Sequence, residues 1–270
     1  MKDIPDRFKL QFFIFIALLA LLLFFLLLRM GDERSQQAEE SYKKGETSTT
    51  ISARKTYFNQ ALSLFLQLDA EYQPNLGSGK LSYNIGNTYF QLGEYPLSIL
   101  YYKRAEKLMP RSDIVERNLL QAYSKINIKP IKKNNIFGLL LLEPILSLPE
   151  RIQIFFTLAL VTLIFISWWL WTGKPWISKT AVILLSLSLF FLLNLGVTHY
   201  FASIDAVLIH AAELRRDAGN EFAKVGDLPI PGGTTVEVLG SAPNGKWLKV
   251  VTSDGEFGFV PNDALRVISK

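Results

Sequence analysis

Cysteine is absent from the 270 residues of this chain, and histidine occurs only twice. The lack of cysteine excludes a disulfide framework, a thiolate zinc site and a cysteine nucleophile. His199 and His210 have no acidic or sulfur partners at the spacing of a metal site. Ser203 and Asp205 follow His199 closely, but no nucleophile-elbow or oxyanion-hole sequence accompanies them. We therefore expect no cofactor, no metal and no catalytic residue, and a chain that is not an enzyme.

Motifs for binding nucleic acid are also missing. The formal net charge is +5, yet the basic residues are scattered, whereas a nucleic-acid site gathers them on one face or in a known motif. We therefore expect no nucleic-acid partner. Hydrophobic residues make up 49% of the chain and are concentrated in long runs. A chain of this length is long enough for two small domains, and the apolar runs exceed what their cores need. These runs therefore indicate membrane spans.

The first apolar run, Phe12–Leu28, follows a short basic tail and has about the minimum length of a spanning helix. A secretory signal peptide is the alternative interpretation, but such a peptide ends in a small-x-small cleavage site. Residues 29–32 read RMGD instead. The sequence therefore favours an uncleaved transmembrane anchor, or signal-anchor, within residues 1–30.

Two further apolar runs, residues 152–171 and 180–197, are separated by a short turn. The first of them ends in three tryptophans, which are typical of the headgroup level of a bilayer. We predict a transmembrane helical hairpin over residues 151–198. Before it, residues 129–150 read as a basic linker and an apolar stretch broken by prolines, for which an interfacial helix is expected. The alternative is that this stretch packs under the preceding domain.

The orientation of the spans is predicted from their short flanking segments, since long segments cross membranes largely regardless of charge. The basic residues of the N-terminal tail and of the hairpin turn should stay on the cytoplasmic side. Three spans then place both polar domains on the periplasmic side of a bacterial inner membrane. The basic residues concerned are Lys2, Arg7, Lys9, Lys174 and Lys179.

Residues 81–110 follow the helix-turn-helix pattern of tetratricopeptide repeats. Ile85, Gly86 and Tyr89 stand at the Leu, Gly and Tyr of the first helix of that pattern, and Pro110 stands at its final proline. Small serines replace the Trp and the Ala of the pattern, and a small residue still lets the helices approach closely.

The spacing of apolar residues predicts the same two helices, residues 81–92 and 95–108, without reference to a family. Gly93 should end the first helix, because glycine takes the left-handed conformation without steric cost. A helical hairpin of this kind cannot bury its apolar face alone, so neighbours must stack on it. Residues 38–44 and 53–68 are expected to form a degenerate first repeat, joined by a loop with the sequence GETSTT.

A third helix is indicated by a recurrence at the repeat period. Asn84 and Ile85 recur as Asn118 and Leu119, thirty-four residues later. We therefore predict a helical-repeat domain of the tetratricopeptide type over residues 31–128.

The equivalent asparagines also indicate a binding face. Asn84 and Asn118 should project along one inner face of the stacked hairpins, with Lys80, Asn87 and Arg117 close by in this register. An asparagine amide offers a donor and an acceptor to a peptide backbone, and a basic residue meets an acidic side chain or a terminal carboxylate. The alternative is that the two asparagines only hydrogen-bond between adjacent helices.

Residues 199–270 change from a helical to an alternating pattern, which predicts a small all-β domain. Pairs of turn residues such as Asn-Gly and Asp-Gly separate its short strands. Strands are expected at residues 206–209, 213–215, 234–239, 247–251, 258–260 and 265–267.

This C-terminal sequence resembles the bacterial SH3 domain. Gly233 and Thr234 match the Gly-Thr that opens a central strand, and Trp247 matches the usual tryptophan. Residues 258–261 match the Gly-Trp-Val-Pro motif, with Phe259 in place of its tryptophan. The resemblance implies an SH3-like barrel.

Two aromatic residues of this domain form a second candidate site. Phe257 and Phe259 lie two apart on one predicted strand and therefore share a face. One interpretation makes them a platform for peptidoglycan stem peptides. The other is that both side chains fill the core of the barrel.

The sequence thus predicts a multidomain membrane protein with an all-α helical-repeat domain, transmembrane helices and an all-β SH3-like barrel. The order of these modules, together with the phrase YNIGNTYFQLGEYPLSILYYKRA, resembles the BatE-type proteins of the bacterial aerotolerance operon. The resemblance implies a non-enzymatic scaffold of the cell envelope. Its implied partners are membrane proteins with von Willebrand A domains and a MoxR-type AAA+ ATPase. Binding of cell-wall peptides through the SH3-like domain is the alternative function.

Overall fold

The computed structural model of the chain describes residues 33–72, 79–129, 138, 142–201 and 203–268. They fall into two compact units, one drawn from residues 34–149 and 197–268 and the other from residues 150–196. The anchor predicted at residues 12–28 lies outside the described residues, as do residues 130–137 and 139–141 of the predicted linker and interfacial helix. Residues 142–147 form turns and a bend, so the prediction of an interfacial helix is wrong for them.

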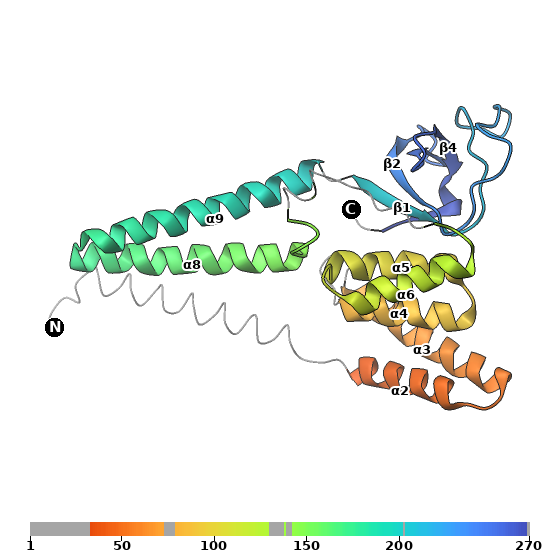
Figure 1. The fold of residues 1–270 in the computed structure, drawn as a ribbon, viewed down its shortest axis with the longest axis horizontal. Coiled ribbons are helices and arrows are strands. Elements are labelled where there is room, and N and C mark those ends of the chain that lie inside the picture. Colours follow the sequence, from red (N-terminus) through yellow and green to blue (C-terminus); the bar gives the residue numbers. More distant parts are fainter. Residues whose placement is uncertain (1–32, 73–78, 130–137, 139–141, 202, 269–270) are drawn as a thin grey trace. The chain divides into compact units, whose positions relative to one another are not determined.

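The helical part of the first unit consists of α2 (Glu33–Thr47), α3 (Ile51–Tyr72), α4 (Gly79–Leu92), α5 (Tyr95–Leu108) and α6 (Asp113–Lys125). Figure 1 shows these helices stacked side by side. The two helices predicted from periodicity are confirmed as α4 and α5. Gly93 separates them with a φ of +84°, the left-handed conformation expected of a glycine stop.

The α4–α5 hairpin is held together by a close approach at Gly86. A Cβ atom at this position would stand 2.6 Å from Cδ1 of Tyr102, so only a glycine leaves room for the ring. Ser82 and Ser98, the two small residues of the repeat pattern, are both buried. The side chains that share the helical core include Phe65, Ile85, Ile99, Leu119 and Tyr123.

The first half of the loop predicted at GETSTT, residues 45–47, is helix. α2 continues to Thr47, and only residues 48–50 separate it from α3. Gly45 lies within α2 and packs against the ring of Phe58, which leaves no room for a side chain at this position. Close packing, rather than a need for a turn, therefore explains this glycine.

The sheet of the first unit has the strand order β4-β3-β2-β1-β5, and every neighbouring pair is antiparallel. Its buried core includes Leu208, Val236, Val250 and Val260. The strands are β1 (Ile204–Leu208), β2 (Thr235–Ser241), β3 (Trp247–Val251), β4 (Phe257–Pro261) and β5 (Leu265–Val267).

Five of the six predicted strands are confirmed by this sheet, and the prediction at residues 213–215 is wrong. In its place the structure has isolated backbone bridges, in which Arg215 pairs with Lys224 and with Phe259. The Arg215 side chain explains the irregular backbone, because it donates to the carbonyl oxygens of Asn220 and Phe222 and folds the loop around itself.

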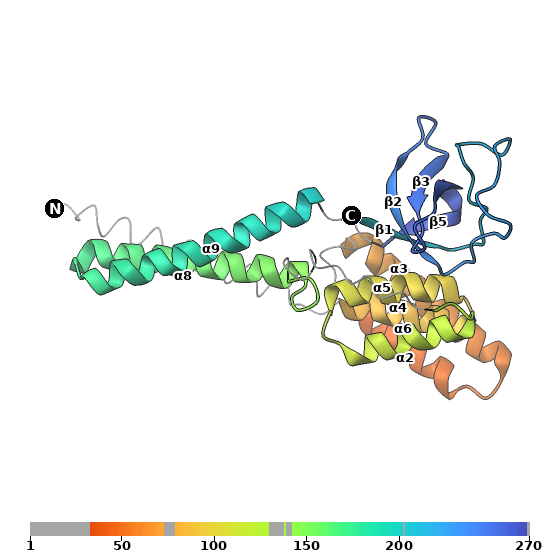
Figure 2. The same cartoon turned by 45° about the horizontal axis from the view of Figure 1, so that its top comes forward.

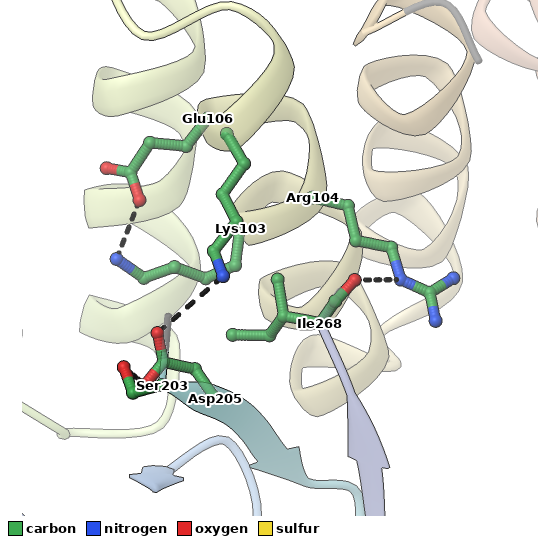
Figure 3. Close-up of polar contacts among 7 residues, drawn as sticks. Lys103, Arg104, Glu106, Ser203, Asp205 and Ile268 are labelled. Atoms are coloured by element: carbon green, nitrogen blue, oxygen red, sulfur yellow. Dashed lines mark hydrogen bonds and ion pairs between the residues drawn. The ribbon is translucent and has the colours of Figure 1, made fainter. Parts of the chain in front are cut away.

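The sheet packs directly on the helices of its unit. Val207 of β1 and Ile268, just after β5, belong to the helical core. Arg104 of α5 donates to the carbonyl oxygen of Val267 at 3.0 Å and to that of Ile268 at 3.1 Å. Figure 3 shows the Arg104 guanidinium directed at the Ile268 carbonyl. The helical core therefore extends onto the sheet, which has a second core cluster of its own.

The second unit is a helical hairpin of α8 (Leu148–Thr172) and α9 (Pro175–Phe201). Both helices are long and apolar enough to cross a membrane, and Figures 1 and 2 both show them running side by side. Arg151 donates to Asn194 Oδ1 at 3.0 Å, and both side chains are buried. This bond joins the first turn of α8 to α9.

Candidate partner-binding face

A hydrogen-bonded cluster joins α4, α5 and α6. Asn118 Nδ2 of α6 donates to Tyr83 OH and to Asn87 Oδ1 of α4, each at 3.0 Å. Tyr102 OH of α5 donates to the same Asn87 oxygen at 2.7 Å. Asn87 Oδ1 thus accepts two hydrogen bonds, which fix the direction of its amide group.

The fixed amides leave one donor and one acceptor for a ligand. Within the described residues, Asn87 Nδ2 and Asn118 Oδ1 have no hydrogen-bond partner, and neither atom is sealed from solvent. An N–H donor and a carbonyl acceptor complement the C=O and N–H of a peptide unit. The pair is therefore able to bind an extended backbone.

The structure brings together only two of the five residues predicted for this face. Asn87 and Asn118 are in contact, and Asn118 bonds between helices, as one of the two interpretations expected. Asn84 is half-buried, and its side chain has no hydrogen bond to a described residue. Lys80 and Arg117 are exposed on α4 and α6. We call these five residues, together with Tyr83, the polar face.

Tyr83 and Tyr102 were not predicted as members of the site. Tyr83 precedes Asn84 and faces Tyr102, with ring centroids 6.0 Å apart. Burial raises the pKa of Tyr102, so its hydroxyl stays protonated and remains a donor to Asn87 at neutral pH. The spacing of Tyr83 and Asn87, four residues apart on a helix, was the available signal.

The sheet contacts the helical part of the unit at α5 and at α6. The side chain of Arg104 is only 15% exposed, lies 3.5 Å from the Asp69 carboxylate and stacks over the Tyr101 ring. Tyr123 OH and Thr235 Oγ1 form a further hydrogen bond of 3.2 Å between α6 and β2.

The two aromatic residues predicted as an SH3-type ligand face differ in exposure. Phe257 is 60% exposed, whereas Phe259 is half-buried and pairs through its backbone with Arg215. The interpretation that both rings fill the core is wrong for Phe257. A separate pocket of about 320 Å³ lies beside the 3-10 turn that follows β4, and Trp247, His210 and Asp263 are among its lining residues.

The described residues contain no cluster of His, Cys, Asp and Glu that is able to hold a metal ion. No protein-family model, no curated protein and no solved structure matches the chain. The chemistry of the polar face is therefore the basis on which a function is proposed.

Proposed function

We propose that this protein is a non-enzymatic scaffold anchored in a membrane, which binds an extended segment of a partner protein on its polar face. The observation that carries the proposal is the pair of amides at Asn87 and Asn118, 3.0 Å apart and held in place by Tyr83 and Tyr102. Helical repeats commonly bind extended peptides along one face, and a fixed donor and acceptor match a backbone without reading its side chains.

The packing of the sheet supports this choice of face. Arg104 and Val207 fill the α5 side of the repeats with contacts inside the chain. Because the sheet also contacts α6 through Tyr123, a partner that approaches the helices has chiefly the α4 side available, where Asn87 of the polar face lies.

Positive charge on α4 and α6 favours an acidic partner. Arg117, like Lys80, is exposed on a helix that carries one of the two amides, and guanidinium and ammonium groups bind carboxylates. A domain of five helices offers a small surface, so useful affinity is expected from several modules that act together.

The identity of the partners is proposed from the resemblance to BatE-type proteins. We take them to be membrane proteins with von Willebrand A domains, working with a MoxR-type ATPase. The two long apolar helices support an attachment to a membrane. We place the chain in the bacterial inner membrane, with both polar parts on the periplasmic side, because of the basic residues in its short flanking segments.

Site-specific photocrosslinking tests the proposal. A photoreactive amino acid replaces Arg117 on the polar face or, as the matched control, Lys55, which is exposed on α3. We expect position 117, and not position 55, to crosslink a von Willebrand A protein in native membranes. Asn84→Ala, which removes no hydrogen bond within the described residues, should lower the yield.

Equal crosslinking from both positions, or none from position 117 while the partner still co-purifies, would place the partner elsewhere on the molecule. In either case the polar face is not the docking site. The scaffold function would then have to rest on another surface.

Binding of cell-wall peptides is a second candidate function, and the exposure of Phe257 favours it. An exposed ring on a strand is a flat surface on which a peptide can pack. Retention of the chain on peptidoglycan fragments, lost in Phe257→Ala and kept in Asn84→Ala, would select this function over the scaffold.

A further inference from the structure

The hairpin of α8 and α9 has one acidic residue, Glu150, which lies in the first turn of α8, at the far end of that helix from the connecting turn. From Arg151 to Ile204 the sequence contains no aspartate or glutamate. Lys174 and Lys179 stand at the turn between the two helices, and both are exposed. No acidic residue of the hairpin neutralises these two lysines, so its turn end carries a positive charge.

The same end of the hairpin holds most of the tryptophan in the chain. Four of the five tryptophans lie within nine residues, 168–176, which cover the end of α8, the connection and the start of α9. Trp168 and Trp176 pack edge to face across the turn, with ring centroids 5.4 Å apart. The exposed fractions of the four are 40% for Trp168, 39% for Trp169, 68% for Trp171 and 52% for Trp176.

The turn itself is tight. α8 ends at Thr172 and α9 begins at Pro175, so Gly173 and Lys174 alone connect them, and Gly173 takes a φ of +66°. The short connection keeps the tryptophans of both helices at one level. Tryptophan favours the headgroup level of a bilayer, which brings Lys174 to the depth of the phosphates.

We propose that this turn, the hairpin tip formed by residues 168–179, is a binding surface for the headgroups of anionic phospholipids. The lysines supply the charge that recognises the headgroup, and the tryptophans fix the depth at which it is recognised. The inference rests on the membrane attachment in the proposed function. Each lysine near an anionic leaflet strengthens binding to that leaflet by about 1 kcal/mol, which is about fivefold in the binding constant.

Tryptophan fluorescence tests the inference on the full chain in lipid vesicles. Brominated lipids quench tryptophans that touch them, so vesicles with brominated phosphatidylglycerol and with brominated phosphatidylcholine report which lipid surrounds the tip. Trp247 is buried in the sheet and supplies a constant background, which Trp247→Phe removes. We expect phosphatidylglycerol to quench more strongly at equal mole fraction.

The double variant Lys174→Gln/Lys179→Gln should make the two brominated lipids quench alike. Lys55→Gln/Lys125→Gln, which neutralises two exposed lysines of the helical repeats, is the matched control and should keep the preference. Equal quenching by both lipids in the unaltered chain would overturn the inference and leave the membrane attachment intact. Absence of quenching by either lipid would overturn both.

Discussion

The Cα of Gly86 lies so close to the ring of Tyr102 that an added Cβ would stand 2.6 Å from Cδ1. Gly86→Ala should therefore push the ring out of its place and lower the free energy of unfolding by about 1–3 kcal/mol. Chemical denaturation of the detergent-solubilised protein measures this change. Gly240→Ala is the control, since a Cβ there meets nothing within 4 Å. Equal losses in both variants would contradict a specific contact with Tyr102.

Arg104 is the polar link between the helices and the end of β5. Arg104→Ala removes its hydrogen bonds to two carbonyl oxygens and its ion pair with Asp69. Hydrogen bonds from charged groups contribute about 1.5–3 kcal/mol each, so we expect a loss of stability of at least about 2 kcal/mol. Arg54→Ala, at an exposed position of α3, should change stability little. A matching loss in Arg54→Ala would contradict the role of Arg104.

Asn87 and Asn84 should separate stability from binding. Asn87→Ala leaves the Tyr102 hydroxyl without its acceptor and should lower the free energy of unfolding by about 1–2 kcal/mol. Asn84→Ala should leave stability unchanged and weaken partner capture. Denaturation and photocrosslinking of the same two variants measure both effects. Loss of stability in Asn84→Ala would show that its side chain is structural.

Alkaline pH should destabilise the helical part of the first unit. Burial raises the pKa of Tyr42 from 10.0 to about 12, with Glu46 adding to the rise. The folded state therefore holds the phenol proton more tightly than the unfolded chain does. The corresponding stability is complete below pH 10 and is lost as the pH rises towards 12. Denaturation curves at stepped pH measure this loss.

Tyr42→Phe is the control for the alkaline prediction, because it retains the ring that packs against Phe58 at 5.2 Å. The variant should lose less stability between pH 10 and 12 than the unaltered chain. An unchanged pH dependence would mean that other groups, such as the buried Tyr101 and Tyr102, account for it.

Local sequence patterns predicted the elements that depend on local interactions. α5 begins at Tyr95 and ends at Leu108, as its apolar spacing indicates. The stop at Gly93 and the strand that begins at Trp247 follow in the same way from turn residues and alternation. Each of these features is set within a few residues of chain.

The rest depended on contacts between distant residues. Asn118 and Tyr83 are 35 positions apart, and Arg104 and Val267 are 163 apart. No periodicity specifies which side of α5 the sheet covers, because that choice is made by the fit of side chains. The nearest sequence signal for this cluster was the recurrence of Asn84 as Asn118 in the repeat register. That signal places Asn84 beside Asn118 on the binding face, whereas in the structure Asn118 is hydrogen-bonded to Asn87.

An arginine residue contacts the open side of each outer strand of the sheet, β4 and β5. The backbone of Arg215 exchanges hydrogen bonds with Phe259 of β4, and the side chain of Arg104 occupies the Val267 carbonyl of β5. Unpaired backbone groups along an edge strand recruit strands from other molecules. The two arginines occupy such groups on β4 and β5 and so hinder the pairing of one copy's sheet with the next.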